Sequence, residues 1–149
     1  MRLSFPLAFL LAAFLACETA QAQAAPIPRV KLNPGALAYA EQLLQQKRCV
    51  ADKRNAWGAH RPSAAAENAF IHRNGFGAYA KWYLGIDEHH AANSKARYKF
   101  PYGDFQNVHR CALLAIKARA RQHGYLDIEN AATKLEEELK VATSNVTPR

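Results

Sequence analysis

Histidine, cysteine and acidic side chains are the groups in this sequence whose chemistry could hold a metal ion. The run AspGluHisHis at 87–90 puts carboxylates beside imidazoles, and His72, His109 and Cys111 are further candidates. Zinc sites usually show a CysxxCys pair or two histidines four residues apart on a helix, and neither spacing occurs here. On a helix His109 and Cys111 would point about 200° apart. The sequence therefore predicts no metal ligand and no cofactor, and a solvated polar loop at 87–90.

Cys111 is also a candidate nucleophile, with His109 or His123 as its general base. We expect Cys111 inside a helix near Leu113 and Leu114, which indicates burial. The sequence has no GxSxG motif, no paired-carboxylate spacing and no glycine-rich phosphate loop. We therefore predict no catalytic residue, and a structural role for His109 with a backbone carbonyl as its partner. The alternative left open is a small metal-dependent or hydrolytic enzyme that uses four histidines: His72, His89, His90 and His109.

A basic and aromatic stretch offers a third kind of chemistry, the binding of anions. Lysine and arginine alternate with tyrosine and phenylalanine over residues 95–105, and further cations share one side of the helix expected next. Basic groups neutralise phosphates, and exposed aromatic rings stack on bases. The alternative is that the rings pack in the core, the basic stems cover the surface, and Arg110 pairs with Asp104 or Asp87. The predicted binding residues are Arg97, Lys99, Arg110, Lys117 and Arg121, with Tyr98 and Tyr102 as stacking or packing groups.

The charge of the chain agrees with an anionic partner. The formal net charge is +8 over 149 residues, and the isoelectric point is about 9.6. Such a balance favours nucleic acid, phospholipid headgroups or acidic polysaccharide as partners, without choosing among them. A positive charge that serves only solubility is the alternative.

The N-terminal segment resembles an export signal. Arg2 precedes an apolar run, and small residues then alternate at Ala20, Ala22 and Ala24, which predicts a signal peptide over 1–24. The apolar run is shorter than the roughly 20 residues that a membrane-spanning helix needs. We therefore expect a periplasmic or secreted protein with no transmembrane span in the mature chain. The alternatives are a lipoprotein attached through Cys17, an uncleaved apolar tail, or a cytoplasmic protein with nucleic acid as its ligand.

The remaining two cysteines fit an oxidising compartment. A Cys49–Cys111 disulfide is predicted, which would close a loop of about 62 residues and contribute about 4 kcal/mol in the chain-entropy model. Two buried free thiols are the alternative.

The periodicity of apolar residues predicts an all-α fold, a small bundle of four to five helices. Asn33 and Pro34 begin the first helix, Ser63 the second, Asp104 the long fourth and Asp127 the fifth. A short third helix is expected over 76–84. The domain plan is a flexible linker at 25–32, a helical domain at 33–141 and a frayed tail at 142–149.

Two strings carry a resemblance to other proteins. LysTrpTyrLeuGlyIleAsp at 81–87, and ArgTyrLysPheProTyrGlyAspPhe with ValHisArgCys within 97–111, resemble a group of short uncharacterised bacterial proteins over about residues 33–140. The spacing Tyr-x-x-Pro-x-x-Asp before a helix with histidine is more loosely similar to small phage-associated domains. Neither resemblance implies an activity or a catalytic residue, and the short bacterial proteins have no leader.

The sequence thus predicts an exported small binding domain with a basic surface and no catalytic signature. The partner expected for it is an anionic polymer, a headgroup or an envelope protein. Nucleic acid becomes the leading partner only if the leader is not functional.

Overall fold

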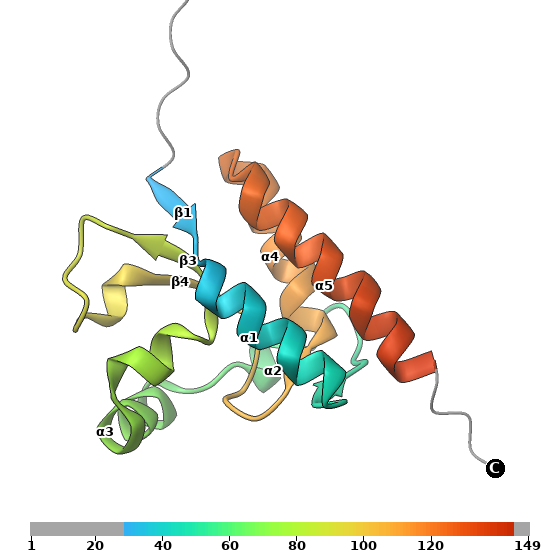
Figure 1. Cartoon of the computed structure of the whole chain (residues 1–149), viewed down its shortest axis with the longest axis horizontal. Helices are drawn as coiled ribbons and strands as arrows, with labels where there is room; N and C mark the ends of the chain where they lie inside the picture. Colours follow the sequence, from blue (N-terminus) through green and yellow to red (C-terminus); the bar gives the residue numbers. More distant parts are fainter. Residues whose placement is uncertain (1–28, 145–149) are drawn as a thin grey trace, which may run out of the picture.

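The computed structural model describes residues 29–144, which form helices around two small sheets (Figure 1). The helices are α1 (Pro34–Gln45), α2 (Trp57–His60), α3 (Ala64–Ala80), α4 (Arg110–His123) and α5 (Leu126–Ser144), with a 3₁₀ turn η1 at Lys95–Arg97. The strands are β1 (Val30–Leu32), β2 (Cys49–Val50), β3 (Tyr83–Asp87), β4 (Tyr98–Pro101) and β5 (Val108–His109).

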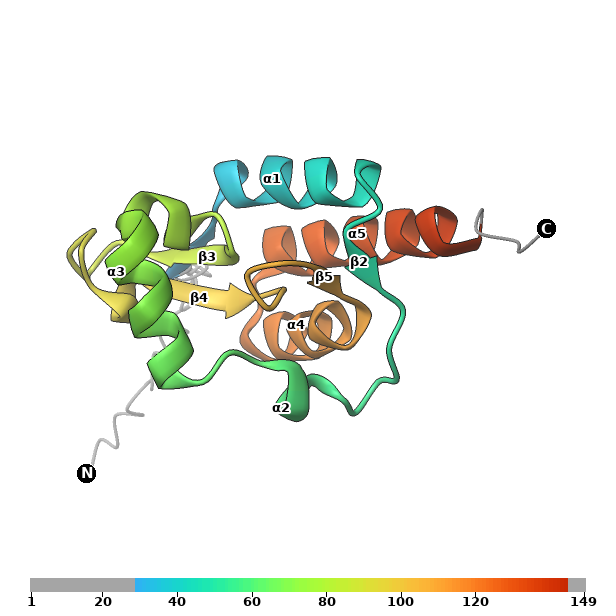
Figure 2. The same cartoon turned by 90° about the horizontal axis from the view of Figure 1, so that it is seen from below.

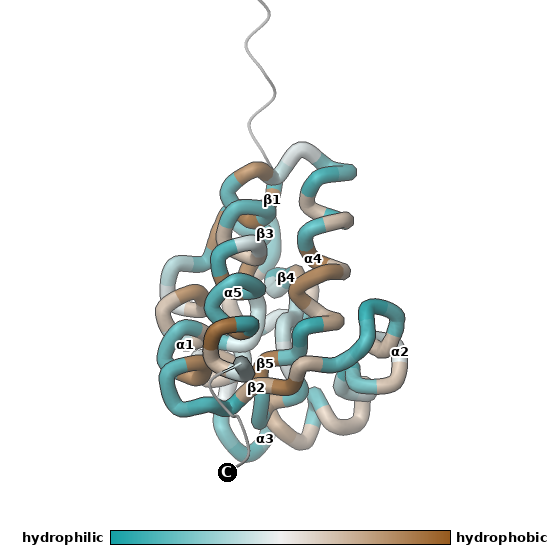
Figure 3. The backbone as a smooth tube through the Cα atoms, turned by 90° about the vertical axis from the view of Figure 1, so that its right-hand side faces the viewer, coloured by the Kyte–Doolittle hydropathy of each residue, from teal (hydrophilic) through white to brown (hydrophobic). Residues whose placement is uncertain are grey.

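Three helices pack together and contact the larger sheet. α4 and α5 form a hairpin that turns at Gly124, whose left-handed φ of 71° ends α4 without the steric cost of a side chain. α1 lies along α5, as Figure 2 shows. Apolar and polar residues alternate along α4 and α5 in Figure 3, as expected of helices with one buried side. The buried sides contribute core residues that include Leu43, Leu113, Ile116, Leu135 and Leu139.

The three-stranded antiparallel sheet has the order β1-β3-β4. Asn33 connects this sheet to α1, because its side chain accepts the Ala36 N–H at the helix start and donates to the carbonyls of Ala80 and Tyr83. Gly85 lies in the central strand, where a Cβ would come within 2.8 Å of side-chain atoms on both neighbouring strands. The sheet therefore depends on a residue without a side chain at its centre.

The expectation of an all-α fold is wrong, because the described residues form a mixed α and β structure. The segment 76–84, expected as a helix, contains the end of α3 and the start of β3. In β3 the residues of both faces are largely buried. The strand therefore lacks the alternation of apolar and polar residues that marks a half-exposed strand. β2 and β5 have two residues each, too few to show a period.

Several expected boundaries also differ from the structure. The linker range 25–32 includes β1, and α5 continues to Ser144, past the expected tail boundary. Asp104 does not begin α4; its carboxylate accepts the N–H groups of Gln106 and Asn107 in a turn, and α4 begins at Arg110. The predicted signal peptide over 1–24 and Cys17 lie outside the described residues. Within 29–144, no helix is long and apolar enough to cross a membrane.

Candidate functional site

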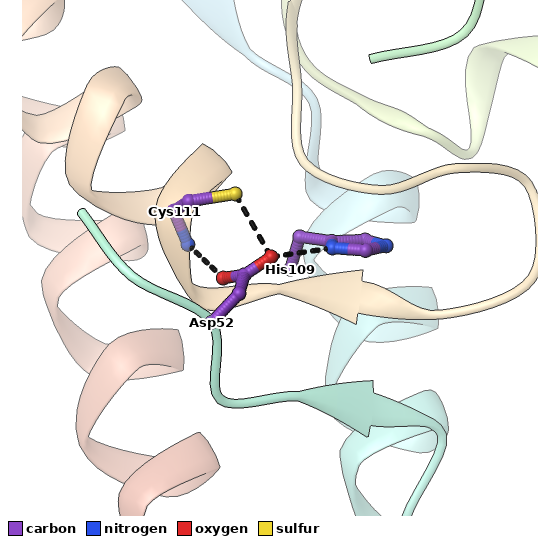
Figure 4. Close-up of side chains that lie close together, drawn as sticks. All are labelled: Asp52, His109 and Cys111. Carbon is purple, nitrogen blue, oxygen red and sulfur yellow. Dashed lines mark hydrogen bonds and ion pairs between the residues drawn. The ribbon is translucent and has the colours of Figure 1, made fainter. Parts of the chain in front are cut away.

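A cluster of polar side chains lies where the loop after β2 meets the start of α4 (Figure 4). β2 and β5 pair in parallel, with Val50 opposite His109, so the chain after each strand continues in the same direction. This register brings Asp52 beside His109 and Cys111. The Asp52 carboxylate accepts hydrogen bonds from His109 Nδ1 at 2.7 Å, from the Cys111 backbone N–H at 2.7 Å and from Cys111 Sγ at 3.0 Å.

Asp52 acts as the N-terminal cap of α4. The residue that precedes α4, His109, makes no side-chain capping bond of its own. The first N–H groups of a helix have no partner within the helix, and a carboxylate there is favoured by the positive end of the helix dipole. Asp52 supplies that carboxylate across a sequence separation of 59 residues. The contact fixes the 51–56 loop to the core.

His109 lies between two carboxylates. Its Nδ1 faces Asp52, and its Nε2 lies 3.2 Å from Oδ2 of Asp104. That second approach is poorly aligned, so within residues 29–144 the buried Nε2 has no hydrogen-bond partner of good geometry. The ring of His60 packs on His109 with centroids 4.8 Å apart, and Trp57 follows at 6.2 Å. His109 is thus buried, as expected, but its partner is a carboxylate and not a backbone carbonyl.

The cluster does not favour a cysteine nucleophile. Burial raises the pKa of Cys111 to about 12, and the hydrogen bond to Asp52 and its negative charge act in the same direction. Burial also opposes ionisation of Asp52, but the hydrogen bonds from Cys111 and His109 outweigh it and lower the pKa of the carboxyl group. In addition, the Asp52 carboxylate lies between the Cys111 thiol and the His109 imidazole. A histidine base would need a direct hydrogen bond to the thiol in order to accept its proton.

The two cysteines in the described part of the chain are free thiols. Cys49 is opposite Val108 in the parallel pair, while Cys111 lies three residues further along and donates its S–H to Asp52. The bridge predicted between Cys49 and Cys111 is therefore not present in the structure.

The predicted basic row on α4 lies at its interface with α5. Lys117 Nζ is 2.7 Å from the buried Glu136 carboxylate, and Arg110 Nε is 3.7 Å from it. Arg121 pairs with Glu129 at 2.6 Å. The positive charges of all three predicted binding residues are therefore compensated by carboxylates of α5. Arg110 pairs with Glu136 and not with its expected partners, Asp104 or Asp87.

The predicted tyrosines are core residues. Tyr98 is 8% exposed and Tyr102 is fully buried. Their hydroxyls donate to the carbonyls of Ala92 and Lys81. Arg97 donates to the carbonyl of His90. The tyrosines therefore pack and have no face free for stacking.

The predicted histidines do not form one site. His89 and His90 both approach the buried carboxylate of Asp87, at 3.0 and 3.6 Å. His72 is exposed on α3, and His109 belongs to the Asp52 cluster. The arrangement needed for the enzyme alternative, with these histidines around one substrate, is not seen.

A basic cleft of about 550 Å³ lies between β4, α2 and α4. Its cationic lining residues are Arg29, Arg61, Lys99 and Arg119, and its aromatic lining residues are Trp57, Phe100 and Tyr125. Asp87 is the one carboxylate in the lining, and it pairs with Arg29 at 2.9 Å. Within residues 29–144, the other three cations have no carboxylate within ion-pair distance. Lys99 is the only predicted binding residue among the residues that line this cleft.

Phe100, which lines the cleft, has an unusual backbone conformation. Its φ of 63° lies in the left-handed region, which residues other than glycine rarely adopt. Its ring packs edge-to-face on Tyr125, with centroids 5.9 Å apart. Strain of this kind persists where the surrounding packing holds it, and such positions are frequent at functional sites.

Sequence reasoning missed most of this region. The segment ArgAsnAlaTrpGlyAlaHisArgPro at 54–62 supplies Trp57 and Arg61 to the cleft and the His60 ring that packs on His109, and none of the three was predicted as a site residue. A tryptophan, a histidine and arginines within one short segment are the signal that could have marked it. Comparison with known proteins gave no matching family model, no matching curated protein and no matching solved structure.

Proposed function

We propose that this protein is a small binding domain that holds an anionic ligand in the cleft between β4, α2 and α4. The observation that supports this most directly is the convergence of Arg61, Lys99 and Arg119 on one cavity without carboxylate partners among the described residues. Cations in one cleft repel each other, and an anion that enters it removes that repulsion. The row of Arg110, Lys117 and Arg121 is a weaker candidate because its charges are already paired.

The aromatic lining favours a ligand that also has a flat or apolar part. Trp57, Phe100 and Tyr125 are half-buried, so each keeps some ring surface at the cleft. Binding pockets for small molecules commonly have volumes of about 300–1,000 Å³, with mostly apolar walls and a few polar groups. The cleft falls in this range. A ring bearing a phosphate, sulfate or carboxylate group would use both parts of the lining.

The proposal keeps the exported location predicted from the N-terminal segment. In the cell envelope, anionic groups of this kind occur on polymers, lipid headgroups and small metabolites. If the leader is not functional, the same cleft would meet nucleotides or single-stranded nucleic acid.

Adenosine monophosphate is a suitable probe, because it joins an aromatic ring to a phosphate. We expect it to bind more tightly than adenosine or inorganic phosphate alone, measured by calorimetry or by Trp57 fluorescence. Raising the salt from about 50 to about 200 mM should weaken binding, because the contacts are ionic. Binding that does not respond to salt would contradict the proposal.

Two triple variants test the location of binding. Arg61→Ala/Lys99→Ala/Arg119→Ala should lower the affinity about 100-fold, since each of the three lost contacts with an ionised group contributes about 1 kcal/mol. The matched control is Lys53→Ala/Arg54→Ala/Arg73→Ala, which removes the same charge outside the cleft. Equal losses in both variants would show a nonspecific charge effect and refute the cleft as the site.

A further inference from the structure

We propose that Asp52, His109 and Cys111 form a binding site for a divalent transition-metal ion of the zinc class, with His60 as the fourth ligand. The cluster borders the basic cleft through Trp57, but none of its four proposed ligands lines the cleft, and the inference does not depend on it. The inference also differs from the prediction made from sequence spacing, which found no ligand set because Asp52 is far from the other residues in the chain.

The donor atoms already lie close to the separations found in a metal site. One carboxylate oxygen of Asp52, one ring nitrogen of His109 and the sulfur of Cys111 lie within 4.8 Å of one another. A tetrahedral zinc ion holds its ligands at about 2.0–2.3 Å, so ligand atoms around it are about 3–4 Å apart. The observed separations from Asp52 Oδ2, 2.7 Å to Nδ1 and 3.0 Å to Sγ, need only a small expansion.

Two of the ligands, Asp52 and His109, have outer neighbours of the kind that orient ligands in metal sites. Oδ1 of Asp52 accepts the backbone N–H of Cys111, and this bond turns Oδ2 toward the imidazole and the thiol. Nε2 of His109, the ring nitrogen that points away from the cluster, lies 3.2 Å from the Asp104 carboxylate, an approach that must become better aligned before a hydrogen bond forms. A histidine that binds metal through one nitrogen commonly donates its other N–H to a carboxylate.

The position of His109 between two carboxylates is compatible with an ion on its Nδ1. A neutral ring has one N–H, so one of its two nitrogens would present a lone pair to a carboxylate, at 2.7 or 3.2 Å. With a metal on Nδ1, the proton can remain on Nε2 and face Asp104. Starting from the doubly protonated ring, one M²⁺ enters and two protons leave, from His109 Nδ1 and Cys111 Sγ. The total charge of the cluster is unchanged.

His60 provides the fourth ligand from the solvent side. Its Nε2 lies 3.9 Å from Asp52 Oδ2, and its side chain is 38% exposed, while Cys111 is fully buried. His60 belongs to the four-residue helix α2, and its ring packs on the ring of His109. A rotation of this one exposed side chain would complete a tetrahedral set and would give the ion a path to the site.

Cobalt is the probe for this site, because a tetrahedral Co²⁺ with a thiolate ligand has visible d–d bands and a near-ultraviolet charge-transfer band. The protein is the full chain carrying Cys17→Ser, so that two thiols remain. We expect one ion per chain and both kinds of band. Absence of the charge-transfer band in this protein overturns the proposal, whatever the behaviour of the variants.

Substitutions of single residues test which side chains bind the ion. Cys111→Ser should remove the charge-transfer band, and the matched control Cys49→Ser should keep it. His60→Ala should weaken cobalt binding about 10-fold or more. A charge-transfer band that survives in Cys111→Ser, or an affinity unchanged in His60→Ala, refutes the site as drawn. If Cys111→Ser does not fold, the parent spectrum and His60→Ala decide the outcome.

The cleft and the metal site can be told apart in the same assay. The Lys99→Ala/Arg119→Ala variant should bind cobalt with the parent spectrum, because both residues line the cleft and neither is a proposed ligand or adjacent to one in the sequence. Failure of the anion proposal would then leave the metal proposal intact, and the reverse also holds.

Discussion

Replacing Asp52 by alanine should destabilise the protein more than replacing any exposed carboxylate. The change removes the acceptor for three donors at once: the Cys111 N–H, the Cys111 S–H and the His109 Nδ1–H. Asp52 is 8% exposed and Cys111 is fully buried, so water cannot readily replace the lost acceptor.

The size of the loss in unfolding free energy follows from the three donors that Asp52→Ala leaves without an acceptor. A buried donor without an acceptor costs about 1–3 kcal/mol, and the thiol is the weakest of the three donors. The total loss is therefore about 3–5 kcal/mol, a large fraction of the 5–15 kcal/mol that holds an ordinary domain together. Asp52→Asn should lose less, because an amide oxygen can still cap α4, but its NH₂ group cannot accept from the other two donors.

Urea denaturation, with a chelator present to remove any metal contribution, measures the free energy of unfolding of each variant. The control is Glu137→Ala, which removes an exposed carboxylate on α5. A loss below about 1 kcal/mol for Asp52→Ala, similar to that of the control, would refute the capping argument.

Three further outcomes are expected. Burial opposes ionisation of Glu136, but its hydrogen bonds with two lysines lower its pKa in the folded protein; its contribution to stability is therefore present above the unfolded pKa of about 4.3 and lost as the pH falls through the folded value. Urea midpoints measured down this pH range should fall more steeply for the parent protein than for Glu136→Gln. Gly85→Ala should lower the free energy of unfolding by about 1–3 kcal/mol, measured by the same method, because its Cβ would lie 2.8 Å from two side chains; an unchanged midpoint would contradict the tight strand contact. Thiol titration of the unfolded, unreduced Cys17→Ser chain should find two thiols, because Cys49 and Cys111 are free in the structure; finding none would show that they are bridged.

Local signals gave several helices correctly. Asn33 and Pro34 begin α1, and Ser63 accepts the N–H that starts α3, because capping depends on residues close in sequence. Gly124 ends α4, at the position after a helix where glycine is common. The buried aromatic residues around the 97–105 turn were recognised as a feature, but whether they were exposed was not decided by their spacing.

The strands could not be predicted in the same way. β1 and β4 are stabilised by pairing with β3, and β2 pairs with β5 across a sequence separation of 59 residues, so no local period reports these strands. The acidic residues on α5 posed a similar problem. Glu129 and Glu136 are both buried against cations of α4, and their spacing along α5 does not report this contact.

The amino-acid sequence by itself determined the positive charge of the chain and the ends of its main helices, because charge is additive and helix termini depend on neighbouring residues. Only the tertiary structure decided which charges remain available. It paired the α4 cations with α5, left Arg61, Lys99 and Arg119 together in a cleft, and brought Asp52 to His109 and Cys111. These contacts join residues far apart in the chain, and their energies depend on burial and distance, which no spacing along the sequence specifies.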